Sequence, residues 1–115
     1  MKITVPKIYP ITDTRISGLS HLEQVRRLIS GGASLIQLRD KTAAAGEFYR
    51  TAFEAIDYAH QHGAKIIIND RADVALAAGA DGVHLGQDDL SPDHARDLLG
   101  PSAIIGFSTH SAEQA

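Results

Sequence analysis

Short apolar runs alternate along the chain with longer stretches of helical periodicity, and a polar cluster closes each run. Ile66-Ile67-Ile68, for example, leads into Asn69-Asp70-Arg71, and three other runs end in the same way. If the runs are parallel strands, their carboxyl ends meet at one edge of one sheet. That edge is where β/α enzymes place their chemistry, so we expect the polar clusters to collect there.

The pattern predicts alternating strands and helices. Ser20 with Glu23 has capping-box spacing, Gly31-Gly32 ends the helix that follows, and Ser91 with Pro92 begins another. Pro10 lies inside the first predicted strand, where it cannot donate to a ladder. The predicted strands are 7–12, 34–39, 65–69, 82–85 and 103–107. The predicted helices are 20–30, 45–61, 72–78 and 92–99, and residues from 111 onward read as the first turn of another.

Four β/α units and a fifth strand predict an α/β fold with a parallel sheet. A TIM (β/α)₈ barrel typically needs about 200 residues or more. The 115 residues therefore predict one domain, residues 1–115, forming a truncated barrel. A five-stranded open sheet of flavodoxin type is the alternative. It requires a complete last helix, which the five residues after His110 do not supply.

Composition narrows the function classes. The net charge is −3, so no bulk basic field favours nucleic acid, and any anionic substrate must be held by local cations or a metal. The absence of cysteine excludes disulfides and thiolate chemistry. No apolar stretch is long enough for a membrane span, and the start lacks a secretory apolar region. We therefore expect a cytoplasmic enzyme.

Cations follow the second strand. Alternation along 34–39 places Gln37 and Arg39 on one face, and Lys41 follows just beyond the strand. An inward arginine is costly unless it is paired or meets an anion. Arg39 and Lys41 together suit a pyrophosphate group. The other interpretation is that these cations form an internal ion pair with Asp70 or Asp89, and both interpretations remain open at this point.

Carboxylates and hydroxyls follow the later strands. Asp70 and Asp89 end neighbouring strands and suit Mg²⁺, which takes one or two carboxylates plus phosphate oxygens. Their alternative roles are a helix cap for Asp70 and a solvated loop charge for Asp89. Ser108 suits a phosphate oxygen or an ordinary cap, and His110 suits general acid–base chemistry, though the sequence shows no partner for it.

The other histidines read as structural. His60 and His62 flank a helix end, where partial positive charge suits the dipole. His84 reads as a hydrogen-bonded residue inside the barrel. His21 and His94 fall in first helical turns and are expected at the surface.

The chain resembles the thiamine phosphate synthase family. Five blocks carry the resemblance, in the family's order and over nearly the whole chain. They are Tyr9-Pro10-Ile11-Thr12-Asp13, Gln37-Leu38-Arg39-Asp40-Lys41, Ile68-Asn69-Asp70-Arg71, residues 80–89 and residues 105–110. Asp40 departs from the pattern, because the family usually has glutamate there. Length departs too, because the family barrel is nearly twice as long and its later strands carry the thiazole-phosphate site.

The resemblance implies a (β/α)₈ barrel that joins an aminopyrimidine methyl diphosphate to a thiazole phosphate, giving thiamine phosphate and pyrophosphate. It also implies Mg²⁺ as cofactor and the following roles. Gln37, Arg39, Lys41 and Asn69 bind the pyrimidine diphosphate, Asp70 and Asp89 hold Mg²⁺, Ser108 contacts the pyrimidine substrate or its diphosphate, and Tyr9 lines the pyrimidine pocket. Among these, Arg39, Lys41 and Ser108 are the expected catalytic residues.

Two alternatives to the synthase function remain. A TenI-like thiazole tautomerase has the same fold and a histidine matched here by His110, but it tends to lack the metal carboxylates. A half barrel could instead be an assembly module, since its edge strands and buried faces are open. It would then form a homo-oligomer or pair with a missing second half, and we expect the 115-residue chain to be oligomeric or aggregation-prone.

Overall fold

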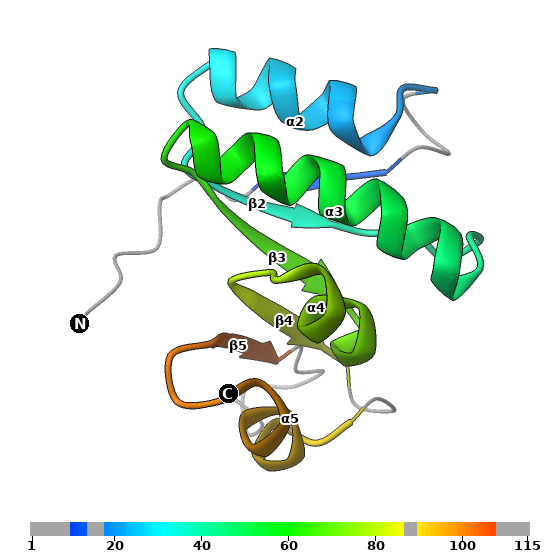
Figure 1. Ribbon diagram of the computed structural model, residues 1–115, viewed down its shortest axis with the longest axis vertical. Coiled ribbons are helices and arrows are strands. Elements are labelled where there is room, and N and C mark those ends of the chain that lie inside the picture. Colours follow the sequence, from blue (N-terminus) through cyan, green and yellow to red (C-terminus); the bar gives the residue numbers. More distant parts are fainter. Residues whose placement is uncertain (1–9, 14–17, 87–89, 108–115) are drawn as a thin grey trace.

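The computed structural model describes residues 10–13, 18–86 and 90–107. Within them, strands and helices alternate along the chain (Figure 1). The strands are β1 (Ile11–Thr12), β2 (Leu35–Leu38), β3 (Lys65–Asn69), β4 (Gly82–Leu85) and β5 (Ile104–Phe107). The helices are α2 (His21–Ser30), α3 (Ala45–Gln61), α4 (Ala72–Ala78) and α5 (Pro92–Leu99).

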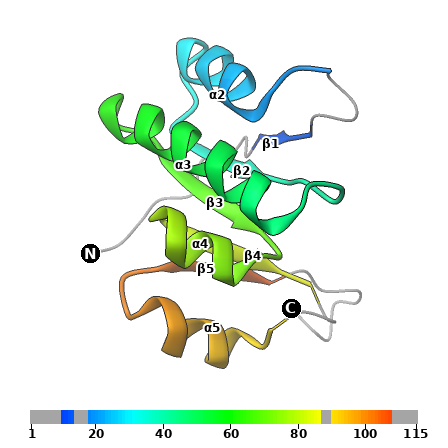
Figure 2. The ribbon, with the colours of Figure 1, turned by 45° about the vertical axis from the view of Figure 1, so that its right-hand side comes forward.

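The strands form one parallel sheet whose spatial order is the chain order, β1-β2-β3-β4-β5. All four helices contribute to a single apolar cluster, with Val25 of α2 at one end and Ala95 of α5 at the other. The helices therefore cover one face of the sheet, and each packs against the next along it (Figure 2).

This arrangement decides between the two predicted folds. A flavodoxin-type sheet has the strand order 2-1-3-4-5 and carries helices on both faces. Sequential order with helices on one face is the arrangement of a (β/α)₈ barrel wall. The prediction of a partial barrel is confirmed, and the open-sheet alternative is wrong.

Local sequence explains why the helices begin and end where they do. The Ser20 side chain accepts a hydrogen bond from the Glu23 backbone N–H (3.1 Å), and Ser91 accepts from the His94 N–H (3.3 Å). Gly79 ends α4 with φ +76°, a conformation that glycine adopts without steric cost. The predicted bounds of α3, β3, α4 and β4 match the structure.

The other strands are shorter than predicted. β2 stops one residue short at each end, and β5 begins one residue later. Of the first predicted strand, the structure describes residues 10–12, and Ile11–Thr12 of these form β1, while residues 1–9 lie outside the described part. Pro10 precedes β1, and its carbonyl accepts from the Gln37 N–H (3.0 Å). The turn expected from 111 onward also lies outside the described residues.

Alternation along the strands separates two buried layers. Leu38, Ile68 and Val83 share one cross-sheet row and face the helices in the apolar cluster. Gln37 and Ile67 form the adjacent row, on the opposite face, and both are buried. The expectation that a half barrel leaves this face open is therefore wrong at the centre of the sheet. Within the described residues, no helix combines the length and apolar character needed to cross a membrane.

Candidate functional site

The carboxyl edge of the sheet brings polar side chains from neighbouring strands together. The Asn69 side-chain amide, at the end of β3, donates a 2.7 Å hydrogen bond to the Gln37 side-chain oxygen on β2. Gln37 is only 2% exposed, on the face that the helices do not cover. The predicted convergence of these two amides at one edge is confirmed, and each fixes the orientation of the other.

Lys41 and Asp70 form an ion pair across the same edge. Both side chains remain partly exposed, so solvent and a small ligand can reach them. Asp70 has φ +70°, a left-handed conformation that is uncommon outside glycine and is tolerated best by Asn and Asp. Its backbone N–H donates to the carbonyl of His84 at 2.8 Å, which ties the turn after β3 to β4.

Arg39 is paired, but not with the partners considered from the sequence. Its Nη1 lies 3.0 Å from Oδ2 of Asp13, which directly follows β1. The suggested internal ion pair with Asp70 is present, but it is formed by Lys41 and not by Arg39. The guanidinium remains 39% exposed, so an anion can approach it from solvent.

Asp40 organises the loop that carries both cations. One carboxylate oxygen, Oδ1, accepts from the Thr42 N–H (3.0 Å), the Thr42 hydroxyl (3.1 Å) and the Ala43 N–H (2.9 Å). Burial alone would raise the pKa of Asp40. The hydrogen bonds from Ala43, Thr42 and His21 outweigh it and lower the pKa below its ordinary value, so Asp40 is held as a carboxylate.

His21 is buried, contrary to the expectation of a surface position. It is 1% exposed, and its Nε2 lies 3.2 Å from Oδ2 of Asp40 while its Nδ1 lies 2.7 Å from the Thr12 hydroxyl. Its place in the first turn of α2 suggested exposure, but that turn packs against the sheet edge. Sequence reasoning missed Thr12, Asp13 and His21, because no single local pattern marks residues that meet across three elements.

Asp70 does not cap α4, which was the alternative role considered for it. The N-cap position of α4 is Arg71, and no side chain caps that end. Tyr9, Asp89, Ser108 and His110 lie outside the described residues. Among the residues that are described, no group of three or more His, Asp or Glu side chains could hold a metal ion. The metal role of Asp70 stays a prediction, and its carboxylate oxygens are the kind of hard donor that Mg²⁺ prefers.

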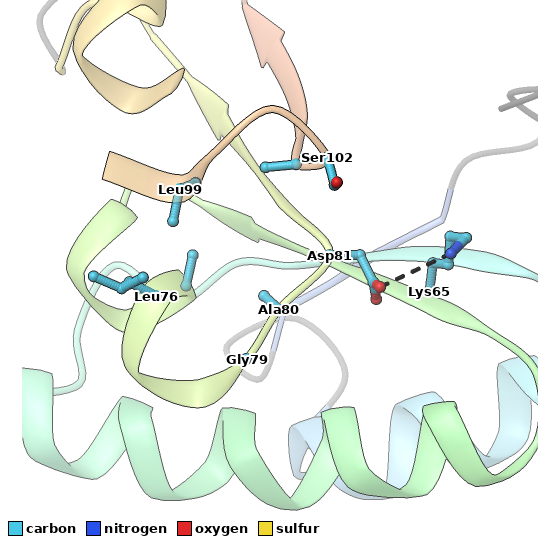
Figure 3. A pocket seen from close by; sticks show the side chains of 9 residues that line it. Lys65, Leu76, Gly79, Ala80, Asp81, Leu99 and Ser102 are labelled. Carbon is cyan, nitrogen blue, oxygen red and sulfur yellow. Dashed lines mark ion pairs between the residues drawn. The ribbon is translucent and has the colours of Figure 1, made fainter. Parts of the chain in front are cut away.

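The opposite edge of the sheet carries a separate cavity of about 380 Å³ (Figure 3). Lys65 and Asp81, 4.0 Å apart, are among the residues that line it, together with the apolar Leu76 and Leu99. Lys65 begins β3 and Asp81 directly precedes β4, so this cavity lies at the amino ends of the strands. None of the predicted site residues within the described part of the chain lines it.

Three comparisons bear on identity. A family model described as thiamine monophosphate synthase matches residues 8–115. A thiamine-phosphate synthase of Chlorobium luteolum is 53% identical over 110 residues, covering 96% of this chain and 50% of the relative. The "Thiamine biosynthetic bifunctional enzyme TH1, chloroplastic" of Arabidopsis thaliana is 46% identical over 111 residues, covering 94% of this chain and 21% of that protein.

Among solved structures, a thiamine phosphate pyrophosphorylase from Pyrococcus furiosus superposes with a TM-score of 0.83 at 39% identity, covering 91% of this chain and 50% of that one. The chain thus spans about half the length of most of the relatives it matches. The family model matches nearly the whole chain, the relatives match in sequence and the solved structure matches in fold, so the chain belongs to the thiamine monophosphate synthase family.

Proposed function

We propose that the protein of which this chain forms the β1–β5 wall is a transferase of thiamine biosynthesis. It would move an aminopyrimidine methyl group from its diphosphate to a thiazole phosphate, giving thiamine phosphate and pyrophosphate. The observation that carries this proposal is the meeting of the Gln37–Asn69 amide pair with the Lys41–Asp70 ion pair at one sheet edge. Neutral and ionic recognition groups lie side by side there, as a base bearing a diphosphate requires.

The roles follow from the chemistry of each side chain. The amides of Gln37 and Asn69 offer donors and acceptors to the aminopyrimidine. Arg39 and Lys41 are the cations for the diphosphate, Arg39 through its planar fork and Lys41 as a point charge. Ser108 would contact the pyrimidine substrate or its diphosphate, and Tyr9 would line the pyrimidine pocket.

Asp70 and Asp89 would hold Mg²⁺. The donor chemistry of Asp70 fits, because Mg²⁺ is bound through one or two carboxylates together with substrate phosphate oxygens. When bound, the ion would neutralise charge on the departing diphosphate. The Lys41 ammonium, already paired with Asp70, lies where it can turn to the same diphosphate.

The reaction needs charge stabilisation more than proton transfer. The bond between the methylene carbon and the diphosphate oxygen breaks, and the electron-rich aminopyrimidine stabilises the methylene cation. The thiazole nitrogen then forms the new bond to that carbon. Arg39 and Lys41 stabilise the negative charge that develops on the leaving group, which is an electrostatic form of catalysis. A cytoplasmic location agrees with two small, charged substrates.

The test is an assay of the full protein with both substrates, measuring thiamine phosphate and pyrophosphate. We expect product only with Mg²⁺, and loss of activity on chelation. Lys41→Met should lower kcat/KM by roughly 100-fold, the scale typical of one lost transition-state contact. Lys65→Met is the matched control, since Lys65 also lies near an aspartate and is half-exposed, but at the opposite edge of the sheet.

Two outcomes would contradict the proposal. One is equal activity of the two lysine variants, which would remove Lys41 from the site. The other is turnover of a thiazole substrate alone without Mg²⁺, which would favour the tautomerase, because tautomerisation has no diphosphate to neutralise.

A further inference from the structure

The cations Arg39 and Lys41 sit on either side of Asp40, whose own side chain turns the other way. The two oxygens of that carboxylate have different partners. Oδ1 gathers three hydrogen-bond donors from Thr42 and Ala43 and shapes the loop, while Oδ2 meets His21 Nε2 at 3.2 Å. The loop that carries both cations therefore depends on where Oδ2 is held.

His21 holds it from a rigid place. The ring is 1% exposed and packs against Phe48 of α3, with 5.6 Å between the ring centroids. Because a carboxylate can only accept, the His21 Nε2 carries the hydrogen of this contact. Nδ1 then faces the Thr12 hydroxyl at 2.7 Å, and Thr12 is anchored in β1. The chain Thr12–His21–Asp40 thus connects β1, α2 and the loop after β2.

A second link runs beside the first. The Asp13 carboxylate pairs with Arg39, and the Asp13 backbone N–H donates to the Gln24 side-chain oxygen in α2 (3.1 Å). The first turns of α2 therefore hold both the end of β1 and the loop after β2. Ordering long side chains such as those of Arg39 and Lys41 around an anion costs rotamer entropy. A loop that is already held in place adds little further ordering cost.

A hydroxyl, an imidazole and a carboxylate in series also suggest a nucleophilic triad. The burial excludes that role, because Thr12 is 0% exposed and lies on the face that packs against the helices. No substrate carbon can reach its oxygen. The arrangement instead positions the loop, as residues that contact a ligand-binding residue but not the ligand do in many sites.

We propose that His21 is a positioning residue for diphosphate binding: through Asp40, and braced by Thr12, it fixes the loop from which Arg39 and Lys41 meet the anion. This rests on the proposed function. We expect the effect to fall on diphosphate binding, because the network joins the start of α2 and the end of β1 to the loop that carries Arg39 and Lys41.

The test measures binding of inorganic pyrophosphate with Mg²⁺ to the full protein by calorimetry, together with amide hydrogen exchange at Thr42 and Ala43. Thr12→Val keeps the shape and removes the hydroxyl, and His21→Phe keeps the ring against Phe48 and removes both nitrogens. We expect both to weaken pyrophosphate binding, by roughly 10-fold for His21→Phe, and to speed exchange at the two amides. Thr12→Ser, which keeps the hydroxyl, should restore wild-type affinity.

Matched controls separate positioning from general loss of stability. Thr51→Val removes a hydroxyl that bonds only within α3, and His94→Phe replaces an exposed histidine of α5. Both should bind pyrophosphate as the wild type does. If His21→Phe fails to fold, Thr12→Val and Thr12→Ser decide the question alone.

The outcomes distinguish the two proposals. Wild-type protein that binds pyrophosphate, with a folded Thr12→Val variant that binds equally well and exchanges equally slowly, overturns the positioning role alone. Wild-type protein that binds no pyrophosphate overturns the diphosphate site, and the role of His21 with it.

Discussion

At the scale of single residues, Asp40 shows how one carboxylate links stability to the candidate site. Its side chain is 10% exposed and has partners on both oxygens. Hydrogen bonds that lower the pKa of a group in the folded state also stabilise that state while the group is ionised. The contribution of Asp40 to folding must therefore depend on pH.

The Asp40→Asn variant tests this dependence. A lowered folded-state pKa gives stability that is present above the unfolded pKa, near 3.9, and is lost as pH falls through the folded value. We expect Asp40→Asn to cost about 1–3 kcal/mol in the free energy of unfolding at pH 7. The difference from wild type should shrink below about pH 4. Urea unfolding at pH 7 and at pH 3 measures both values.

The exposed Asp97→Asn change in α5 is the control, and it should alter stability little at either pH. An equal loss in the free energy of unfolding for Asp40→Asn at pH 3 and pH 7 would contradict this role of Asp40. The loss would then not depend on the ionised carboxylate.

Residue-scale prediction worked where a strand determined the direction of a side chain. Period-2 alternation placed Gln37 on the face away from the helices, and the structure agrees. It failed for His21, because a histidine in a first helical turn looks like a surface residue until the neighbouring strand end and loop are known. The partner of Arg39 was missed for the same reason, since Asp13 lies on the far side of α2 in sequence.

At the scale of elements, the pairing of β4 with β5 leaves no room for side chains at two glycines. A Cβ on Gly82 would lie 1.9 Å from the carbonyl oxygen of Ile104, and one on Gly106 would lie 2.6 Å from Nδ1 of His84. The first obstacle is backbone and cannot turn away, whereas the second is a ring that can shift. The two strands can approach only because these positions are glycine.

Gly82→Ala should therefore destabilise the fold by at least the roughly 1–3 kcal/mol typical of overpacking. Gly106→Ala should cost less, and Gly46→Ala should be neutral or stabilising by up to about 1 kcal/mol, because it sits in the first turn of α3 with nothing within 4 Å of the new methyl group. Thermal or urea unfolding of the three variants gives the order directly. Equal stability of Gly82→Ala and Gly46→Ala would rule out the close approach of β4 and β5.

Elements were predictable where caps and turn residues mark their ends, as at Ser20, Ser91 and Gly79. Strand ends were less predictable, because a strand residue is defined by its partner. Ser34 and Arg39 each make one backbone hydrogen bond to a neighbouring strand, but they lie just outside the bounds of β2. The sequence also did not indicate that β4 and β5 meet at glycines.

At the scale of the whole molecule, the two edges of the sheet have different roles. The carboxyl edge holds the Gln37–Asn69 pair and the cations, and the amino edge holds Asp81. There the Asp81 carboxylate accepts from the Ile66 backbone N–H (2.8 Å) and lies 2.8 Å from His60 Nε2, so it ties α3 and β3 to the start of β4. A (β/α)₈ barrel divides stability and chemistry between its two ends in the same way.

This division predicts that two substitutions separate stability from binding. Asp81→Ala leaves the buried Ile66 N–H without its acceptor, so we expect a loss of about 1–3 kcal/mol in the free energy of unfolding. Its affinity for pyrophosphate with Mg²⁺ should match the wild type, because Asp81 lies at the amino edge of the sheet and the cations lie at the carboxyl edge. Asn69→Ala takes a donor from the buried Gln37 oxygen, so its cost in the free energy of unfolding should be on the same scale, about 1–3 kcal/mol.

Asn69→Ala should instead weaken binding of the aminopyrimidine diphosphate, since Gln37 loses the partner that orients its amide. Urea unfolding and calorimetry on both variants of the full protein make the comparison. If Asp81→Ala weakens substrate binding as much as Asn69→Ala does, the edges are coupled and the site depends on the integrity of the whole wall. If Asp81→Ala lowers stability without changing substrate affinity, and Asn69→Ala lowers substrate affinity, the residues that hold the wall together are distinct from those that recognise the substrate.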